Sequence, residues 1–366
     1  MKKHSRALTL ISLLIGAALF VWLIRQAGLA EILARVRALG AGFILILMIS
    51  AVRQFVRAVA WLRCMMPEDR NVGWLALLKA RLAGDAIGDL TTAGPLIAEP
   101  LKVITLGAKL STSTRISSLA VENLAYAFSS CVMVMAGTLS LLAAFAVSAS
   151  LRVASWMAFG AVLVVLISSM VIVRRRWRVL SGLGEMARRA INHEGRWEEK
   201  LKRVRELEEY VFDFYANRPG DFFLVMLCDT TFHLTGVVEV YVTLKLIGYA
   251  PSLMAAFILE AVNRVINIVF AFVPAMIGVD EAGTGWLANT LGLGATAGLT
   301  LAIIRKGRMF FWIALGLVFL AAGQKERQKA KGKRQKSKVR SELLLVFMTG
   351  CFPYSIFAFC LLPFAF

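Results

Sequence analysis

Histidine and cysteine are scarce in this sequence, and neither is spaced for metal binding or redox chemistry. The three histidines form no pattern of metal ligands, and the five cysteines include no CxxC pair. Scattered cysteines in apolar segments are typical of packed free thiols. The chain also has no GxSxG, HExxH or Walker motif, so ATP hydrolysis within it is not expected. We therefore expect no enzyme activity, no metal and no cofactor.

Charged residues are also few, and long apolar runs dominate. Charged side chains make up 18% of the 366 residues, hydrophobic side chains make up 58%, and the mean hydropathy is +0.70. No ordinary soluble domain tolerates such values, and several runs reach the ~20 apolar residues that span a bilayer as a helix. The alternating segments of about ten residues that are typical of a membrane β-barrel are absent. The sequence thus predicts an all-α, polytopic membrane helix bundle.

Basic residues outnumber acidic ones, and the formal net charge is +19. They are concentrated beside the apolar runs, which is typical of topology signals and of contacts with anionic lipid headgroups. We therefore expect the lipid bilayer as a partner, and no nucleic acid. MKKHSR precedes the run Ala7–Ile24, which is too long for a signal peptide and has no cleavage site after it. It predicts a retained first span in the cell inner membrane, with a cytoplasmic N-terminus.

The apolar runs divide the chain into a transmembrane domain over residues 1–323, a basic cytoplasmic tail over 324–341 and an additional span over 342–366. The domain consists of a first half over 7–173, a cytoplasmic loop over 174–218 and a second half over 222–323. Apolar residues at helical spacing from Trp197 to Phe214 predict an amphipathic helix of the loop on the inner membrane surface. Besides two apolar pairs, the expected spans are Phe43–Leu62, Ile116–Val147, Trp156–Val173, Phe222–Ile247 and Met309–Ala322.

The two apolar pairs are interrupted by glycine, proline and charged residues. The first joins Trp74–Leu90 to Ala93–Leu110, and the second joins Ser252–Val273 to Trp286–Ile304. Charges at membrane depth persist mainly where they face a bundle interior, and glycine and proline there break helices. Each pair is therefore a broken-helix element, either a re-entrant hairpin or two full spans.

The pairs resemble each other, because each contains a Gly/Pro loop that carries a glutamate. Three spans separate them, and an odd number of crossings inverts the second pair relative to the first. Inverted repeats of broken helices are the architecture of alternating-access transporters. The sequence therefore predicts an inverted repeat, the alternative being that any two glycine-rich membrane hairpins look alike.

The charged residues of the two pairs are the candidate site. In the first pair, Arg81, Asp85 and Asp89 follow one another at i,i+4 spacing and lie near one face of a helix. An internal ion pair also explains Arg81 and Asp85, whereas Asp89 has no such partner within its turn. Glu99 lies in the break, and Lys102 follows three residues later.

The second pair repeats this pattern, with Glu260 and Arg264 at i,i+4 spacing and Asp280 and Glu281 in the loop. These two adjacent carboxylates occupy the place that Glu99 has in the first pair. The predicted substrate-binding residues are Arg81, Asp85, Asp89, Glu99, Lys102, Glu260, Arg264, Asp280 and Glu281.

Both loops resemble a known family. LTTAGPLIAEPLKVITL resembles the first signature of the membrane region of lysylphosphatidylglycerol synthases and related flippase-like proteins, and VPAMIGVDEAG resembles the second. The resemblance implies an integral membrane protein that moves lipids between leaflets. It covers about residues 7 to 322. Glu99 and Lys102 match the first signature, and Pro274, Gly278 and Glu281 match the second.

The chain departs from the family pattern at three points. Ala98 replaces a glycine that often precedes the first glutamate, and Lys102 stands where arginine is common. The sequence also has no counterpart of the soluble aminoacyl-transferase domain of the full synthases. We therefore do not expect it to make lysyl lipid, and its cargo need not be that lipid.

The sequence predicts a lipid flippase that moves a polar-headgroup lipid through a cavity lined by Glu99 and Glu281. Arg81, Lys102 and Arg264 would bind an anionic phosphate, or the carboxylates would hold a cationic headgroup. The alternatives are a membrane enzyme that acts on lipid-linked substrates and a non-transporting scaffold for a lipid-synthesis enzyme. A lipid-synthesis enzyme as partner and a homo-oligomer both stay open.

Overall fold

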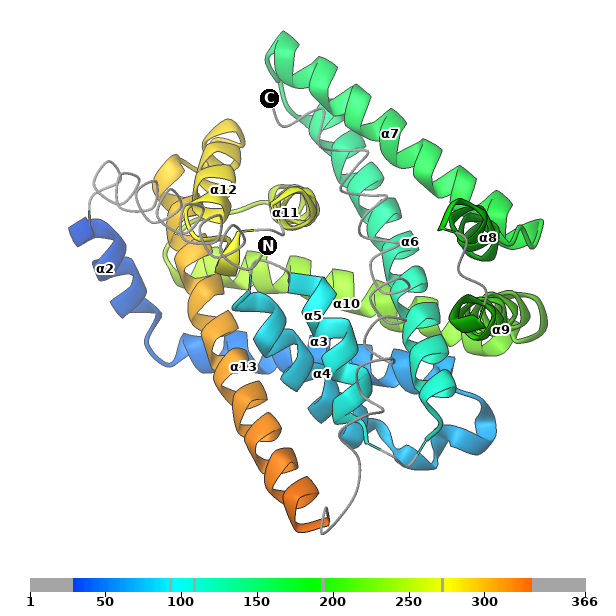
Figure 1. The fold of residues 1–366 in the computed structure, drawn as a ribbon. Helices are drawn as coiled ribbons and strands as arrows, with labels where there is room; N and C mark the ends of the chain where they lie inside the picture. Colours follow the sequence, from blue (N-terminus) through cyan, green and yellow to red (C-terminus); the bar gives the residue numbers. More distant parts are fainter. Residues whose placement is uncertain (1–28, 92–93, 108–109, 192–194, 271–272, 331–366) are drawn as a thin grey trace.

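The computed structural model describes residues 29–91, 94–107, 110–191, 195–270 and 273–330. All regular secondary structure in these ranges is helical, which confirms the predicted all-α bundle (Figure 1). Three predicted segments lie outside the described residues: the first span Ala7–Ile24, the tail from residue 331, and the last span 342–366.

The helices follow one another as α2 (Leu29–Leu39), α3 (Gly42–Cys64), η1 (Pro67–Val72), α4 (Trp74–Asp89), α5 (Gly94–Thr105), α6 (Thr112–Ala144), α7 (Ala149–Arg174), α8 (Val179–Ile191), α9 (Gly195–Asn217), α10 (Pro219–Leu246), α11 (Leu253–Val269), η2 (Pro274–Met276), α12 (Val279–Thr290) and α13 (Ala295–Ala330).

Four of these helices, α3, α6, α7 and α10, are long and apolar enough to cross a membrane. They coincide with the predicted spans. Their starts follow from local chemistry, because Ser111 Oγ accepts a hydrogen bond from Thr114 N at 3.0 Å and caps α6. Ser148 caps α7 in the same way, through Leu151 N at 3.4 Å. The protein is therefore a multi-pass membrane protein.

The second apolar pair differs from the prediction. Trp286–Ile304 is not one helix, because α12 ends at Thr290, and Gly292 and Gly294 adopt positive φ angles of 79° and 85° that end it. A new helix, α13, then runs without a break through the expected boundary before Met309. Basic residues of α13 form ion pairs with carboxylates inside the bundle, so they do not mark the end of a helix.

The helices of both pairs are short. The first pair, α4 and α5, has 16 and 12 residues, and the second, α11 and α12, has 17 and 12. At 1.5 Å per residue these helices are about 18 to 26 Å long, less than the ~30 Å of a bilayer's hydrocarbon core. Their lengths therefore favour hairpins over two full spans.

The long helices α3 and α10 pack side by side and antiparallel (Figure 1). Gly42 at the start of α3 lies against Leu246 at the end of α10, and Met65, just after α3, accepts a hydrogen bond from Arg218, just before α10, at 2.6 Å. The helices α4 and α13 are also antiparallel, since Lys79 lies near Phe319 and Leu82 near Gly316, while α11 crosses α6 (Figure 1). At both of these contacts a glycine permits close approach, as small residues do in membrane helix packing. A Cβ atom added at Gly316 of α13 would lie 2.1 Å from Leu82 O of α4, and one at Gly137 of α6 would lie 2.2 Å from Ala261 Cβ of α11.

We expect Gly316→Leu to destabilise the bundle by about 3 kcal/mol, the upper range for overpacking, because the contact is with backbone and cannot yield by a rotamer change. The measurement is thermal unfolding of the purified protein in detergent, followed by tryptophan fluorescence. Gly160→Leu on α7 is the matched control, because a Cβ atom there meets nothing within 4 Å. Equal unfolding temperatures for the two variants would contradict the close contact.

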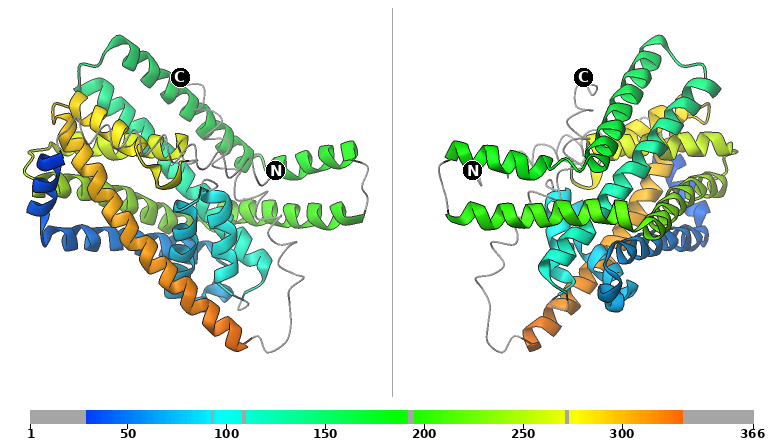
Figure 2. Two further views of the ribbon diagram at one scale, coloured as in Figure 1. Left: turned by 60° about the vertical axis from the view of Figure 1, so that its left-hand side comes forward. Right: turned by 90° about the vertical axis from the view of Figure 1, so that its right-hand side faces the viewer.

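The helices α8 and α9 project from the bundle (Figure 2). The amphipathic helix predicted in the loop exists as α9, but its apolar face packs on the protein and is not free to lie on a membrane. Leu207, Val211 and Phe214 share a core cluster with Ile116 of α6. Tyr210 donates a hydrogen bond to Cys64 O of α3 at 2.8 Å, and burial raises the pKa of its hydroxyl to about 12, so it stays protonated at neutral pH.

Candidate functional site

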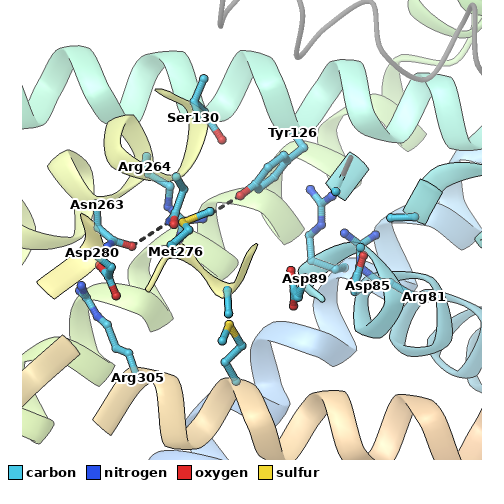
Figure 3. A pocket seen from close by; sticks show the side chains of 18 of the residues that line it. Arg81, Asp85, Asp89, Tyr126, Ser130, Asn263, Arg264, Met276, Asp280 and Arg305 are labelled. Carbon is cyan, nitrogen blue, oxygen red and sulfur yellow. Dashed lines mark hydrogen bonds and ion pairs between the residues drawn. The ribbon is translucent and has the colours of Figure 1, made fainter. Parts of the chain in front are cut away.

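A cavity of about 410 Å³ lies between the two broken-helix pairs, and α6, α10 and α13 close its sides (Figure 3). Of the described residues that line it, seven are basic and four are acidic, so its wall carries an excess of positive charge. Several of these basic residues form ion pairs with carboxylates that lie outside the lining, among them Glu122, Glu239 and Glu260. The basic residues are Arg57, Arg81, Lys102, Arg264, Arg305, Lys306 and Arg308, and the acidic residues are Asp85, Asp89, Glu99 and Asp280.

The first broken pair contributes a compact ion cluster. Lys102 Nζ lies 2.8 Å from Asp85 Oδ1 and 2.8 Å from Glu99 Oε1, and Asn123 donates to the other Glu99 oxygen at 3.0 Å. Lys102 reaches this position because α5 packs against Gly84, where a Cβ atom would lie 2.5 Å from Lys102 Cγ. The single cation is therefore held by two carboxylates.

Two arginines extend this cluster toward α6. Arg81 lies 3.1 Å from Glu122 and 3.7 Å from Asp85, and Arg57 of α3 lies 2.9 Å from Glu122 and 3.5 Å from Asp229. The side chains of Glu122 and Asp229 are almost completely buried. The positive charges on this side of the cavity thus have carboxylate partners.

The second broken pair turns at η2, where Ala275 and Met276 adopt positive φ angles of 51° and 48°. Lys306 of α13 stabilises this turn, because it donates to their carbonyl oxygens at 2.9 and 3.1 Å. Its Nζ atom also lies 3.3 Å from Glu281 and 3.8 Å from Asp280. Lys306 therefore offsets one of the two carboxylate charges at the start of α12.

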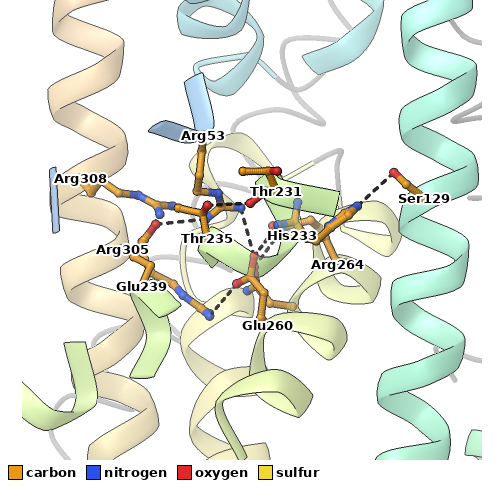
Figure 4. Close-up of polar contacts among 12 residues, drawn as sticks. Arg53, Ser129, Thr231, His233, Thr235, Glu239, Glu260, Arg264, Arg305 and Arg308 are labelled. Carbon is orange, nitrogen blue, oxygen red and sulfur yellow. Dashed lines mark hydrogen bonds and ion pairs between the residues drawn. The ribbon is translucent and has the colours of Figure 1, made fainter. Parts of the chain in front are cut away.

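A network of four arginines and two glutamates adjoins the cavity, and three of its arginines, Arg264, Arg305 and Arg308, line it (Figure 4). Arg53 bridges Glu239 and Glu260 at 3.1 Å each, and Arg308 binds the other oxygen of Glu239. Arg264 and Arg305 bind the two oxygens of Glu260, the latter at 3.4 Å. The network therefore connects α3, α10, α11 and α13.

Seven of the nine predicted residues line the cavity, and Glu260 and Glu281 do not. Glu260 is buried within the arginine network. Glu281, predicted to line the cavity opposite Glu99, is fully buried and accepts a hydrogen bond from Gly278 N at 2.8 Å, which caps α12. Glu281 thus lies outside the cavity lining, because its carboxylate accepts from a free amide at a helix start. The spacing of Gly278 and Glu281, three residues apart at a helix start, is the feature of the sequence that indicates this capping contact.

Four basic residues of the cavity were not predicted. Arg57 lies within the expected span Phe43–Leu62 and follows Arg53 at i,i+4 spacing in a mostly apolar helix. Arg305, Lys306 and Arg308 were assigned to a connection between spans, although an apolar run follows them directly. Charged residues flanked closely on both sides by apolar sequence were the signal that could have found them.

Asp89 has a distinct position. It lines this cavity and also a neighbouring one of about 240 Å³ between α3, α4, α10 and α13. It makes no hydrogen bond or ion pair with any residue that the structure describes. Within the ranges given above, no group of three or more histidine, cysteine, aspartate or glutamate side chains is placed to hold a metal ion.

Comparison with known sequences finds one family. Its sequence model, described as "Lysylphosphatidylglycerol synthase TM region", matches residues 9–316, which include both broken-helix pairs. No curated protein and no solved structure gives a significant match.

Proposed function

The chain belongs to the lysylphosphatidylglycerol synthase transmembrane family, and on this premise we propose that it moves a polar-headgroup lipid between the two leaflets of the membrane. The observation that carries the proposal is the charged cavity within an apolar bundle. Buried charges at membrane depth are costly, and they are typical of pathways for polar substrates. The headgroup would enter the cavity while the acyl or isoprenoid tails stay in the bilayer.

The order of helix lengths supports an inverted repeat. The helices α3 to α6 have 23, 16, 12 and 33 residues, and the helices α10 to α13 have 28, 17, 12 and 36. The first members of the two series, α3 and α10, pack antiparallel. The pairing of α4 with α13 corresponds to that of α6 with α11. Such a repeat would place one broken pair on each side of the membrane, with the cavity between them.

The same proposal includes the membrane and the orientation. The basic flanks favour the cell inner membrane with a cytoplasmic N-terminus, because positively charged segments stay on the cytoplasmic side. The protein would act as a transporter and not as an enzyme. A lipid-synthesis enzyme that supplies the cargo and a second copy of the chain are compatible partners.

The experiment that tests the proposal is a leaflet-accessibility assay with labelled lipids in proteoliposomes. We expect Asp89→Asn to slow lipid movement about tenfold. The cavity loses its unpaired carboxylate, which is free to bind a polar group of the lipid headgroup, and the loss of one hydrogen bond to a charged group has about that effect. Glu99→Gln, which removes a charge from the Lys102 cluster, is expected to slow it as well. Asp213→Asn on α9 is the matched control, since Asp213 lies outside the cavity.

Equal rates for wild type, Asp89→Asn and Glu99→Gln across several headgroups would contradict the proposed pathway. A covalently changed lipid after incubation with the purified protein would favour a membrane enzyme instead. Cavity variants that do not change lipid movement and still bind a lipid-synthesis enzyme would favour the alternative of a non-transporting scaffold.

A further inference from the structure

The arginine network that adjoins the cavity is not electrically balanced. Its four guanidinium groups share only the two carboxylates of Glu239 and Glu260, so two positive charges have no counter-charge within the network. Asp89, which lines the same cavity, has no ion pair with any described residue and makes none with these arginines. A buried charge without compensation is costly, so the arrangement is suited to an anion that completes it.

Several of the described side chains that line the cavity carry a buried polar atom without a hydrogen-bond partner. Arg264 Nε and Arg305 Nη1 have no hydrogen-bond partner, and both side chains line the cavity. They are neighbours, because each binds one oxygen of Glu260. Ser130 of α6 also lines the cavity, and its hydroxyl oxygen has no partner (Figure 3). Arg264, Arg305 and Ser130 are only 8%, 7% and 4% exposed.

The other cations that we expected to bind phosphate are already paired. Lys102 has Asp85 and Glu99, and Arg81 has Glu122 and Asp85. Arg264 and Arg305 are also paired, with Glu260, but each of them keeps one guanidinium nitrogen without a hydrogen-bond partner. The two sides of the cavity therefore differ in their capacity to bind an anion.

We propose that Arg264, Arg305 and Ser130 form a subsite for a phosphate ester, on the side of the cavity made by the second broken pair. The inference rests on the proposed function and narrows it, because it assigns the headgroup phosphate to three named side chains. The two guanidinium groups would donate charge-assisted hydrogen bonds to phosphate oxygens. The Ser130 hydroxyl would donate a third.

Binding is tested by thermal unfolding of the full chain in a neutral detergent. The probes are dihexanoyl phosphatidate, dihexanoyl phosphatidylglycerol, inorganic phosphate and dihexanoylglycerol, which has no phosphate. We expect the two phospholipids to raise the unfolding temperature and dihexanoylglycerol to leave it unchanged. Ser130→Ala should weaken phospholipid binding about tenfold, the effect of one hydrogen bond to a charged group, while the unfolding temperature without probe stays the same.

Arg305→Gln should weaken binding more strongly, and Arg152→Gln on the exposed face of α7 is the matched control. If Arg305→Gln does not fold, Ser130→Ala decides alone, because its hydroxyl has no partner to lose. Unchanged affinity in Ser130→Ala, or equal stabilisation by dihexanoylglycerol, overturns the subsite.

The source of the phosphate and the transport function are judged separately. Stabilisation by inorganic phosphate alone would keep the subsite and assign it to free phosphate, which counts against a lipid cargo. If Asp89→Asn slows lipid movement as expected while Ser130→Ala binds phospholipid with unchanged affinity, the subsite is overturned and the proposed function stays intact.

Discussion

Glu260→Gln is expected to destabilise the protein by about 3–5 kcal/mol, the usual effect of breaking a buried ion pair by removing one partner. The carboxylate of Glu260 is contacted by Arg53, Arg264 and Arg305, and the side chain is only 4% exposed. A neutral amide would leave three guanidinium groups close together with little compensation. It would also place amide hydrogens against arginine donors.

The measurement is the unfolding temperature in detergent, together with the fraction of protein that elutes as a single species. Glu199→Gln is the matched control, because Glu199 forms an exposed ion pair with Arg203 on α9. A double variant, Glu260→Gln with Arg305→Gln, should recover part of the loss because it removes one uncompensated charge. A stable Glu260→Gln protein would show that the arginines have another counter-charge.

Lys102→Met is expected to have a similar cost, again about 3–5 kcal/mol, because it leaves Asp85 and Glu99 without their shared cation. Methionine preserves most of the length of the side chain, so the packing against Gly84 changes little. The loss is therefore electrostatic. Lys202→Met on the exposed side of α9 is the matched control.

A double-mutant cycle isolates the Lys102–Glu99 interaction. Glu99→Gln alone removes one of two carboxylates, whereas Glu99→Gln combined with Lys102→Met removes a charge of each sign. The double variant should be less destabilised than the sum of the single variants, since residues in one ion network are coupled. Additive effects would mean that Lys102 and Glu99 do not interact.

The sequence predicted the long helices well because their signal is local. Apolar runs predict α6 and α7, but α6 begins at Thr112 and not at Ile116, and α7 begins at Ala149 and not at Trp156, because the caps Ser111 and Ser148 set their starts. The break before Gly94 was also visible, since glycine and proline act on the backbone where they stand. These features depend on neighbouring residues in the chain.

The site was predicted only in part because its interactions are distant in sequence. Arg308 binds Glu239, 69 residues away, and Arg53 binds Glu260, 207 residues away. When these distant partners are not known, a basic residue in the sequence indicates a solvent-exposed position. The sequence therefore predicts two spans, one that ends at Ile304 and one that begins at Met309, where the structure has the single helix α13. Asp89 was identified for a local reason, because the residues of its own turn offer no cation. The structure adds that it has no ion pair with any described residue of other elements either.

The backbone contact at Gly316 limits which parts of the protein can move relative to each other. The absence of a side chain at Gly316 lets α13 approach the backbone of α4 at Leu82, and Gly137 lets α6 approach α11 in the same way. A motion that opens the cavity would therefore have to keep or repack these close contacts. The ion pair of Arg305 with Glu260 already joins α13 to α11, and a phosphate bound between Arg305, Arg264 and Ser130 would add α6 to that connection.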